Sequence, residues 1–81
     1  MAGAALPFGV EMTPDRRGAL VVVSGELDLA TAPTLASRLV QAAATTTGNL
    51  LVDLAQVSYV DSTGLHVLLS ARAELADRGR A

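Results

Sequence analysis

The residues best suited to chemistry lie in the stretch Tyr59–Leu65, where an aspartate, two hydroxyl residues and a glycine follow an apolar run. We interpret this stretch as the end of a strand and its outgoing loop, followed by the start of a helix. Either Asp61 or Ser62 can cap that helix, because both side chains accept hydrogen bonds from N–H groups two or three residues later. Such a cap stabilises a helix by ~1 kcal/mol and requires no other function. Gly64 likewise has a structural explanation, since a small residue in the first turn allows close backbone approach.

The same position also suits a phosphorylated serine. A helix N-terminus offers unpaired N–H groups and the positive end of the helix dipole, and both favour the charge of about −1.5 to −2 that a phosphate on Ser62 would add. That phosphate would lie close to Asp61, and close to Asp28 if the strand ends meet. Like charges ~6 Å apart at an effective dielectric constant near 20 repel by roughly 3 kcal/mol. One phosphate could therefore alter partner binding without refolding the protein.

A serine hydrolase is the enzymatic alternative, because Ser62 and His66 are four residues apart on one predicted helix and Asp61 precedes them. We do not favour it, because a catalytic triad needs the aspartate on the far side of the imidazole and an oxyanion hole. The Gly-x-Ser-x-Gly elbow of hydrolases is also absent from the sequence. His66, the single histidine, is better interpreted as a solvated helix residue. We therefore expect neither an enzyme nor a bound metal or cofactor.

Composition restricts the remaining function classes. The 81 residues contain no cysteine, the six basic residues are all arginine, and the formal net charge is -2. Arg16–Arg17 is the one basic pair, so nucleic-acid binding is not expected. Met1–Leu6 is apolar but too short for a signal peptide, and no apolar run approaches the ~18 residues of a membrane-spanning helix. We expect a soluble cytoplasmic module that does not interact with membranes.

The first half of the chain predicts two strands and a helix. Residues 8–12 alternate between apolar and other residues, which indicates a half-buried strand, and Pro14–Gly18 has the composition of a turn. The continuous apolar run Ala19–Gly25 predicts a deeper strand, antiparallel to the first. Thr31 is the predicted N-cap of a helix that should fade over Thr45–Thr47 and stop at Gly48–Asn49. Its expected buried stripe comprises Leu35, Leu39 and Ala42.

A third strand is predicted at Leu50–Leu54, and Ala55–Val60 is expected to carry the chain across the strand end. Strand, helix and strand at this spacing form a β-α-β unit, so the second and third strands should be parallel. The second helix should run from Ser62 to Arg78. Its predicted buried stripe comprises Leu65, Leu68, Leu69, Leu75 and Ala76. The predicted fold is therefore a small mixed α/β sheet, an antiparallel hairpin plus a β-α-β unit, with helices packed on it.

Two segments resemble the STAS domain family, the anti-sigma-factor antagonists of bacteria. Leu50–Leu54 followed by Val57–Leu65 resembles the family signature, and Gly25–Asp28 with the Ala-Thr-Ala-Pro helix start resembles its other recurring block. The resemblance extends from about Phe8 to Gly79. It implies an antagonist that binds an anti-sigma factor with serine kinase activity and thereby releases a sigma factor. Regulation of transcription would follow from this exchange of partners.

In this family the kinase phosphorylates the serine that follows the motif aspartate, and phosphorylation blocks binding. The resemblance places that phosphorylation at Ser62, with Thr63 as a weaker candidate. A phosphatase is a further candidate partner, since it would reverse the modification. The implied partner-binding residues are those of the motif and the acid near it: Asp28, Asp61, Ser62, Thr63, Gly64 and Leu65.

One departure from the family concerns the C-terminus. Family members usually continue with another strand and helix, whereas this chain ends just after Gly79. We therefore expect residues 1–81 to form a single STAS-like domain that is incomplete at its C-terminus and that self-associates through an unpaired sheet edge. Two alternatives remain open: a sensory or scaffold module of a larger signalling complex, and a fragment without a partner of its own. A transporter tail is disfavoured, since the sequence has no transmembrane segment.

Overall fold

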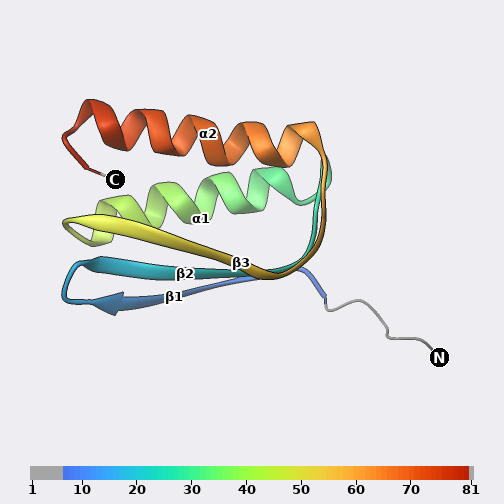
Figure 1. Cartoon of the computed structure of the whole chain (residues 1–81), viewed down its shortest axis with the longest axis horizontal. Coiled ribbons are helices and arrows are strands. Elements are labelled where there is room, and N and C mark those ends of the chain that lie inside the picture. The colour runs from blue at the N-terminus through green and yellow to red at the C-terminus, as the bar shows by residue number, and fades with distance from the viewer. Residues whose placement is uncertain (1–6, 81) are drawn as a thin grey trace.

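The described residues, 7–80 of the computed structural model, form one mixed sheet with two helices on one of its faces (Figure 1). Met1–Leu6 and Ala81 lie outside the described residues. The structure therefore does not test the expectation that Met1–Leu6 is too short for a signal peptide. No helix within residues 7–80 combines the length and the apolar character needed to cross a membrane.

The sheet contains β1 (Gly9–Asp15), β2 (Gly18–Leu27) and β3 (Asn49–Val60) in that spatial order. β2 is central, antiparallel to β1 and parallel to β3, which confirms the predicted hairpin and β-α-β unit. The central place suits the apolar run of β2, because a strand with neighbours on both edges and helices above needs apolar residues along its length. The outer edge of β3 has no partner strand among residues 7–80.

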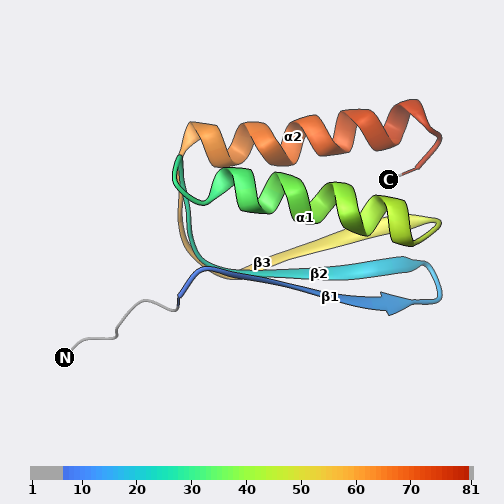
Figure 2. The ribbon, with the colours of Figure 1, turned by 180° about the vertical axis from the view of Figure 1, so that it is seen from behind.

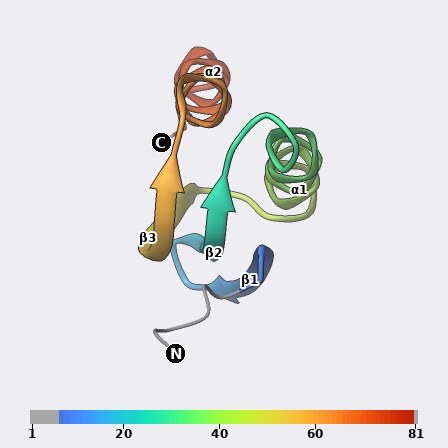
Figure 3. The ribbon, with the colours of Figure 1, turned by 90° about the vertical axis from the view of Figure 1, so that its right-hand side faces the viewer.

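Two helices, α1 (Ala32–Thr45) and α2 (Ser62–Asp77), run side by side above the same face of the sheet (Figure 2). Viewed end-on, α1 lies toward the β1 side and α2 toward the β3 side (Figure 3). The core forms where β2 meets α1. Its fully or nearly buried side chains are Val21, Val23, Leu27, Leu35, Leu39 and Ala42, so the stripe predicted for the first helix is confirmed. Burial of each large side chain contributes about 1.5–3 kcal/mol.

The buried stripe predicted for α2 is largely wrong. Leu75 is buried and Leu68 is half-buried, but Leu65 and Leu69 are 49% and 53% exposed, and Ala76 is exposed as well. The remaining contacts with the core come from Val67 and Ala71. Because α2 lies above the edge strand and has a neighbouring helix on only one side, its other side stays uncovered. Apolar residues occur all around α2, so their spacing did not identify the buried face.

Strand β3 is longer than predicted, because Ala55–Val60 continues the strand instead of crossing the sheet end. Two register shifts accompany this extension, one opposite Val22–Ser24 and one opposite Gly25–Glu26. At each shift β3 contains one more residue than β2. Such bulges bend a strand and increase its twist without ending its pairing. The extension brings the chain directly to Asp61 at the start of α2.

Candidate functional site

Asp61 is the N-cap of α2, which decides between the two caps that the sequence allowed. Its Oδ1 atom accepts a hydrogen bond from the Gly64 N–H at 2.9 Å, and its backbone carbonyl accepts from the Leu65 N–H at 3.0 Å. Ser62 is therefore the first residue inside the helix, and its side chain is not needed as a cap. The predicted helix start is confirmed, and its end at Asp77 lies one residue before the predicted Arg78.

The same aspartate connects α2 to the end of the central strand. Its Oδ2 atom accepts from the Leu29 N–H at 3.2 Å, and its backbone N–H donates to the Leu27 carbonyl at 3.1 Å. The loop between β2 and α1 and the start of α2 are therefore held together at one end of the sheet. This confirms the proximity of the two predicted motif segments, Gly25–Asp28 and Tyr59–Leu65.

Asp28 is engaged within its own loop. Its half-buried carboxylate accepts from the N–H groups of Ala30 and Thr31 at 3.0 and 3.1 Å, an arrangement that closes an Asx-type turn. Thr31 is the N-cap residue of α1, as predicted, but its side chain makes no cap bond to the helix. Instead, Thr31 Oγ1 accepts from the Asp28 N–H at 3.0 Å and donates to the Glu26 carbonyl at 2.8 Å. Asp28 and Thr31 thus shape the loop that Asp61 holds.

Gly64 provides the close approach that lets α2 rest on the end of β2. A Cβ atom at this position would lie 2.5 Å from Leu27 Cγ and 2.8 Å from the Leu27 carbonyl oxygen. Both distances are shorter than carbon atoms tolerate, so a side chain here would displace α2 from β2. This close contact alone explains why a glycine occupies the position. The contact also fixes where Asp61 and Ser62 lie at the start of α2.

Ser62 is the exposed member of this site. Its hydroxyl makes no hydrogen bond within residues 7–80, and neither its N–H nor that of Thr63 is satisfied there. These two groups belong to the first turn of α2, where no intrahelical acceptor exists. An anionic group attached to Ser62 would meet free donors and the positive end of the dipole. Thr63 is half-buried and therefore less accessible than Ser62.

Exposed apolar side chains lie close to Ser62 in the sequence or in the loop that is bonded to Asp61. We call this set, whose members are 41–72% exposed, the apolar rim: Leu29, Tyr59, Val60 and Leu65. Exposed apolar patches mark protein–protein interaction sites, and aromatic residues are enriched at such interfaces. Of the rim, the sequence predicted a partner-binding role for Leu65, and this stays a prediction. The exposure of Leu29, Tyr59 and Val60 was not foreseen, because apolar residues next to strands are ordinarily expected in a core.

The structure does not assemble a catalytic triad from Asp61, Ser62 and His66. The imidazole Nε2 of His66 lies 3.3 Å from Ser70 Oγ, one turn further along α2, and makes no hydrogen bond to Ser62. Asp61 is directed at two backbone N–H groups instead of the imidazole. Residues 7–80 also contain no group of three or more histidine, aspartate or glutamate side chains placed to hold a metal ion.

Comparison with known proteins identifies a family and several similar solved structures, among them two anti-sigma factor antagonists. The family model described as "Mlab, STAS domain" matches residues 12–81. An anti-sigma factor antagonist from Mycobacterium paratuberculosis has 28% identity to this chain and superposes with a TM-score of 0.78. The anti-sigma factor antagonist SpoIIAA, in its unphosphorylated form, has 21% identity and a TM-score of 0.71, and supports the fold alone.

The similarity covers most of this chain and a smaller share of the similar proteins. It includes 84% of this chain and 58% of the mycobacterial antagonist, and 91% of this chain and 67% of SpoIIAA. No curated protein matches the chain. The predicted fold class is confirmed by both structures.

Proposed function

Because the chain belongs to the STAS domain family, we propose that it is an anti-sigma-factor antagonist whose partner binding is switched off by phosphorylation of Ser62. In this proposal the unmodified protein binds an anti-sigma factor with serine kinase activity in the cytoplasm and so releases a sigma factor. A phosphatase restores the unmodified form. The mycobacterial antagonist, with 28% identity, supports the assignment of the partner class.

The observation that carries the proposal is the environment of Ser62. The hydroxyl is exposed, is not used as the helix cap, and lies beside two N–H groups without a partner in the described part of the chain. A kinase could reach this oxygen without unfolding any element. The residues around it are fixed by the bonds of Asp61, so phosphorylation would change the charge of the surface and leave its shape unchanged.

Two electrostatic effects act on a phosphate at Ser62. The helix N-terminus stabilises it by about 0.3–1 kcal/mol at an exposed position. The carboxylates of Asp61 and Asp28 belong to the same end of the sheet and oppose it, by at most about 3 kcal/mol per unit charge at ~6 Å and by less where water screens them. In the free protein, the water around the exposed site weakens this repulsion. A partner that covers the site removes this water, and each 1.4 kcal/mol of added repulsion lowers affinity about tenfold.

The apolar rim defines the surface that a partner would cover. Tyr59, Val60 and Leu65 lie within three residues of Ser62, and the Leu29 N–H donates to Asp61, so a partner that covers these side chains would also reach Ser62. A phosphate could not be left in that interface without loss of its hydration, which is costly for a charged group. Phosphorylation of Ser62 would therefore weaken the binding of any partner that covers the apolar rim.

The test compares three variants with the wild-type protein in binding to a candidate anti-sigma-factor kinase. We expect Ser62→Ala to bind constitutively, also in the presence of ATP, and Ser62→Asp to bind about a hundredfold more weakly, in line with 2–3 kcal/mol of repulsion. Ser37→Asp adds the same charge to the exposed side of α1 and should bind normally. Equal affinities of Ser62→Ala and Ser62→Asp would contradict the charge switch.

We also propose that residues 1–81 act as one domain whose open β3 edge pairs with the β3 strand of a second copy. The edge carries the exposed Leu51 and Leu54 and a single charged residue, Asp53. Natural sheets usually protect such an edge with charges, proline or a covering element. Pairing of two copies would give the backbone N–H and C=O groups of this edge hydrogen-bond partners and would bury these leucines.

A further inference from the structure

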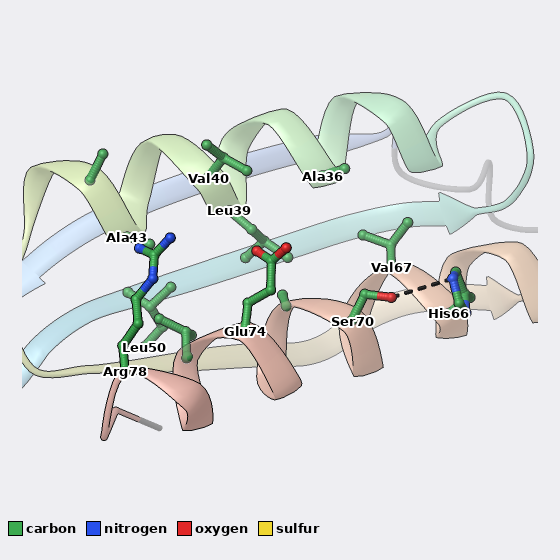
Figure 4. Close-up of a pocket in the computed structure, with 13 residues that line it drawn as sticks. Ala36, Leu39, Val40, Ala43, Leu50, His66, Val67, Ser70, Glu74 and Arg78 are labelled. Atoms are coloured by element: carbon green, nitrogen blue, oxygen red, sulfur yellow. Dashed lines mark hydrogen bonds between the residues drawn. The ribbon is translucent and has the colours of Figure 1, made fainter.

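A groove of about 370 Å³ separates α1 from α2, and its lining on α2 begins at His66, one turn after Ser62 (Figure 4). Leu39, Leu50 and Leu75 contribute apolar side chains from both helices and from β3. Alanines widen it, since they replace larger side chains where the helices face each other: Ala36, Ala43, Ala44 and Ala71. Its volume lies within the range of about 300–1,000 Å³ in which proteins bind small molecules.

One wall of the groove carries a line of polar residues on α2. His66, Ser70, Glu74 and Arg78 follow one another at four-residue spacing and extend over ~18 Å of helix. Ser70 Oγ is hydrogen-bonded to His66 Nε2 at 3.3 Å. Glu74 and Arg78 are directed across the groove toward α1 (Figure 4). Neither of these two charged groups has a hydrogen bond or ion pair with another residue in 7–80.

The unpaired state of Arg78 contrasts with that of Arg80, two residues later. The Arg80 guanidinium donates to the carbonyls of Gly48, Ala43 and Thr46 at 2.7, 2.9 and 3.1 Å. One arginine thus already binds carbonyls at the end of α1 and in the loop that follows it. Arg78 remains available above the groove with an acidic neighbour one turn away, so the groove presents one cation and one anion over an apolar floor.

We propose that this groove binds a small amphiphile with an apolar body and a head that carries both a cationic amine and an anionic carboxylate. The apolar body would displace water from the leucine and alanine side chains. The head would place its carboxylate on Arg78, in the paired geometry that guanidinium groups favour, and its ammonium group on Glu74. A ligand with one charge would leave the opposite protein charge without a partner. This site is distinct from the proposed phosphorylation site and does not depend on it.

Three probes with the same phenyl body and different heads test the proposal: L-phenylalanine, 3-phenylpropionate and 2-phenylethylamine. Their binding to the wild-type protein is followed by amide and imidazole chemical shifts. We expect saturable shifts at the groove residues of α1 and α2, with dissociation constants on the order of millimolar for ligands this small. L-phenylalanine should bind at least about fivefold more tightly than either singly charged probe, since it forms both pairs.

Four variants assign the effect to the groove. Glu74→Gln should remove the advantage of L-phenylalanine over 3-phenylpropionate, and Arg78→Gln its advantage over 2-phenylethylamine. Ala43→Leu should abolish binding of all three probes by filling the groove. Arg72→Gln removes an exposed arginine of α2 that does not line the groove, and should change nothing.

Several results would overturn the proposal. These are absence of saturable shifts with all three probes, equal binding of the three heads, and binding that survives Ala43→Leu. Shifts of the same residues that depend on protein concentration without any probe would show that a second copy occupies the groove instead. None of these results bears on Ser62, whose phosphorylation is measured separately.

Discussion

The Asp61 carboxylate accepts a hydrogen bond from the Leu29 N–H at 3.2 Å and so joins residues 32 positions apart in the chain. With its other oxygen it caps α2 at Gly64. One side chain therefore fixes both the start of the helix that carries Ser62 and the loop that follows the central strand. The geometry of the proposed phosphorylation site depends on this aspartate more than on the serine itself.

Replacement of Asp61 by alanine should lower the free energy of unfolding by about 1–2 kcal/mol, because the helix loses its cap and the loop loses its acceptor. Asp61→Asn keeps one good acceptor and should cost less. Urea denaturation measures both differences. Stabilities equal to that of the wild-type protein for both variants would show that the two hydrogen bonds do not hold the site.

Gly64→Ala should destabilise the protein, although alanine favours helix by about 1 kcal/mol over glycine. The added Cβ would lie 2.5 Å from Leu27 Cγ and 2.8 Å from the Leu27 carbonyl, and overpacking of this kind costs about 1–3 kcal/mol. Ser62→Ala, an exposed change in the same turn, should stay within about 0.5 kcal/mol of wild type. A stabilising Gly64→Ala in the same urea assay would contradict the close contact.

Arg80→Ala should lower stability by about 1–2 kcal/mol, because three hydrogen bonds to the end of α1 and to the loop before β3 disappear together. Arg80→Lys keeps the charge but loses the planar fork, so its stability should be intermediate. Thermal and urea unfolding measure both, with Arg72→Ala as the matched surface control. An Arg80→Ala protein as stable as the Arg72→Ala protein would contradict this role.

The open edge of β3 predicts association that depends on concentration. Leu54→Lys places a charge on this edge and should shift the protein toward the monomer in analytical ultracentrifugation. Val40→Lys changes an exposed apolar residue of α1, 65% exposed, and should leave association unchanged. A wild-type protein that remains monomeric at millimolar concentration would exclude pairing between copies.

Local hydrophobic patterns predicted a helix or strand correctly where the pattern was compatible with only one arrangement of buried residues. The continuous apolar run of β2 required a central strand, and the stripe of α1 required a core-facing helix. The burial of α2 could not be predicted in the same way. Leu65 and Leu69 are apolar, but their burial depends on what lies beside the edge strand. The spacing of apolar residues within α2 carries no information about that neighbour.

Within the site, sequence reasoning identified Asp61, Ser62 and Gly64, whereas their separate roles depend on tertiary contacts. Asp61, and not Ser62, makes the cap bond to Gly64, and its second oxygen also binds the loop after β2, which lies far away in the sequence. The Thr31 side chain was expected to cap α1 and instead bonds to Glu26 and Asp28. Arg80 was missed because its three acceptors are more than thirty positions earlier in the chain.

Mass-spectrometric mapping of phosphate after incubation with an anti-sigma-factor kinase and ATP tests the central claim most directly. The account predicts a single phosphate on Ser62, none in the Ser62→Ala variant, and loss of kinase binding in the modified protein. Phosphate on another residue, or full binding after complete phosphorylation of Ser62, would contradict it.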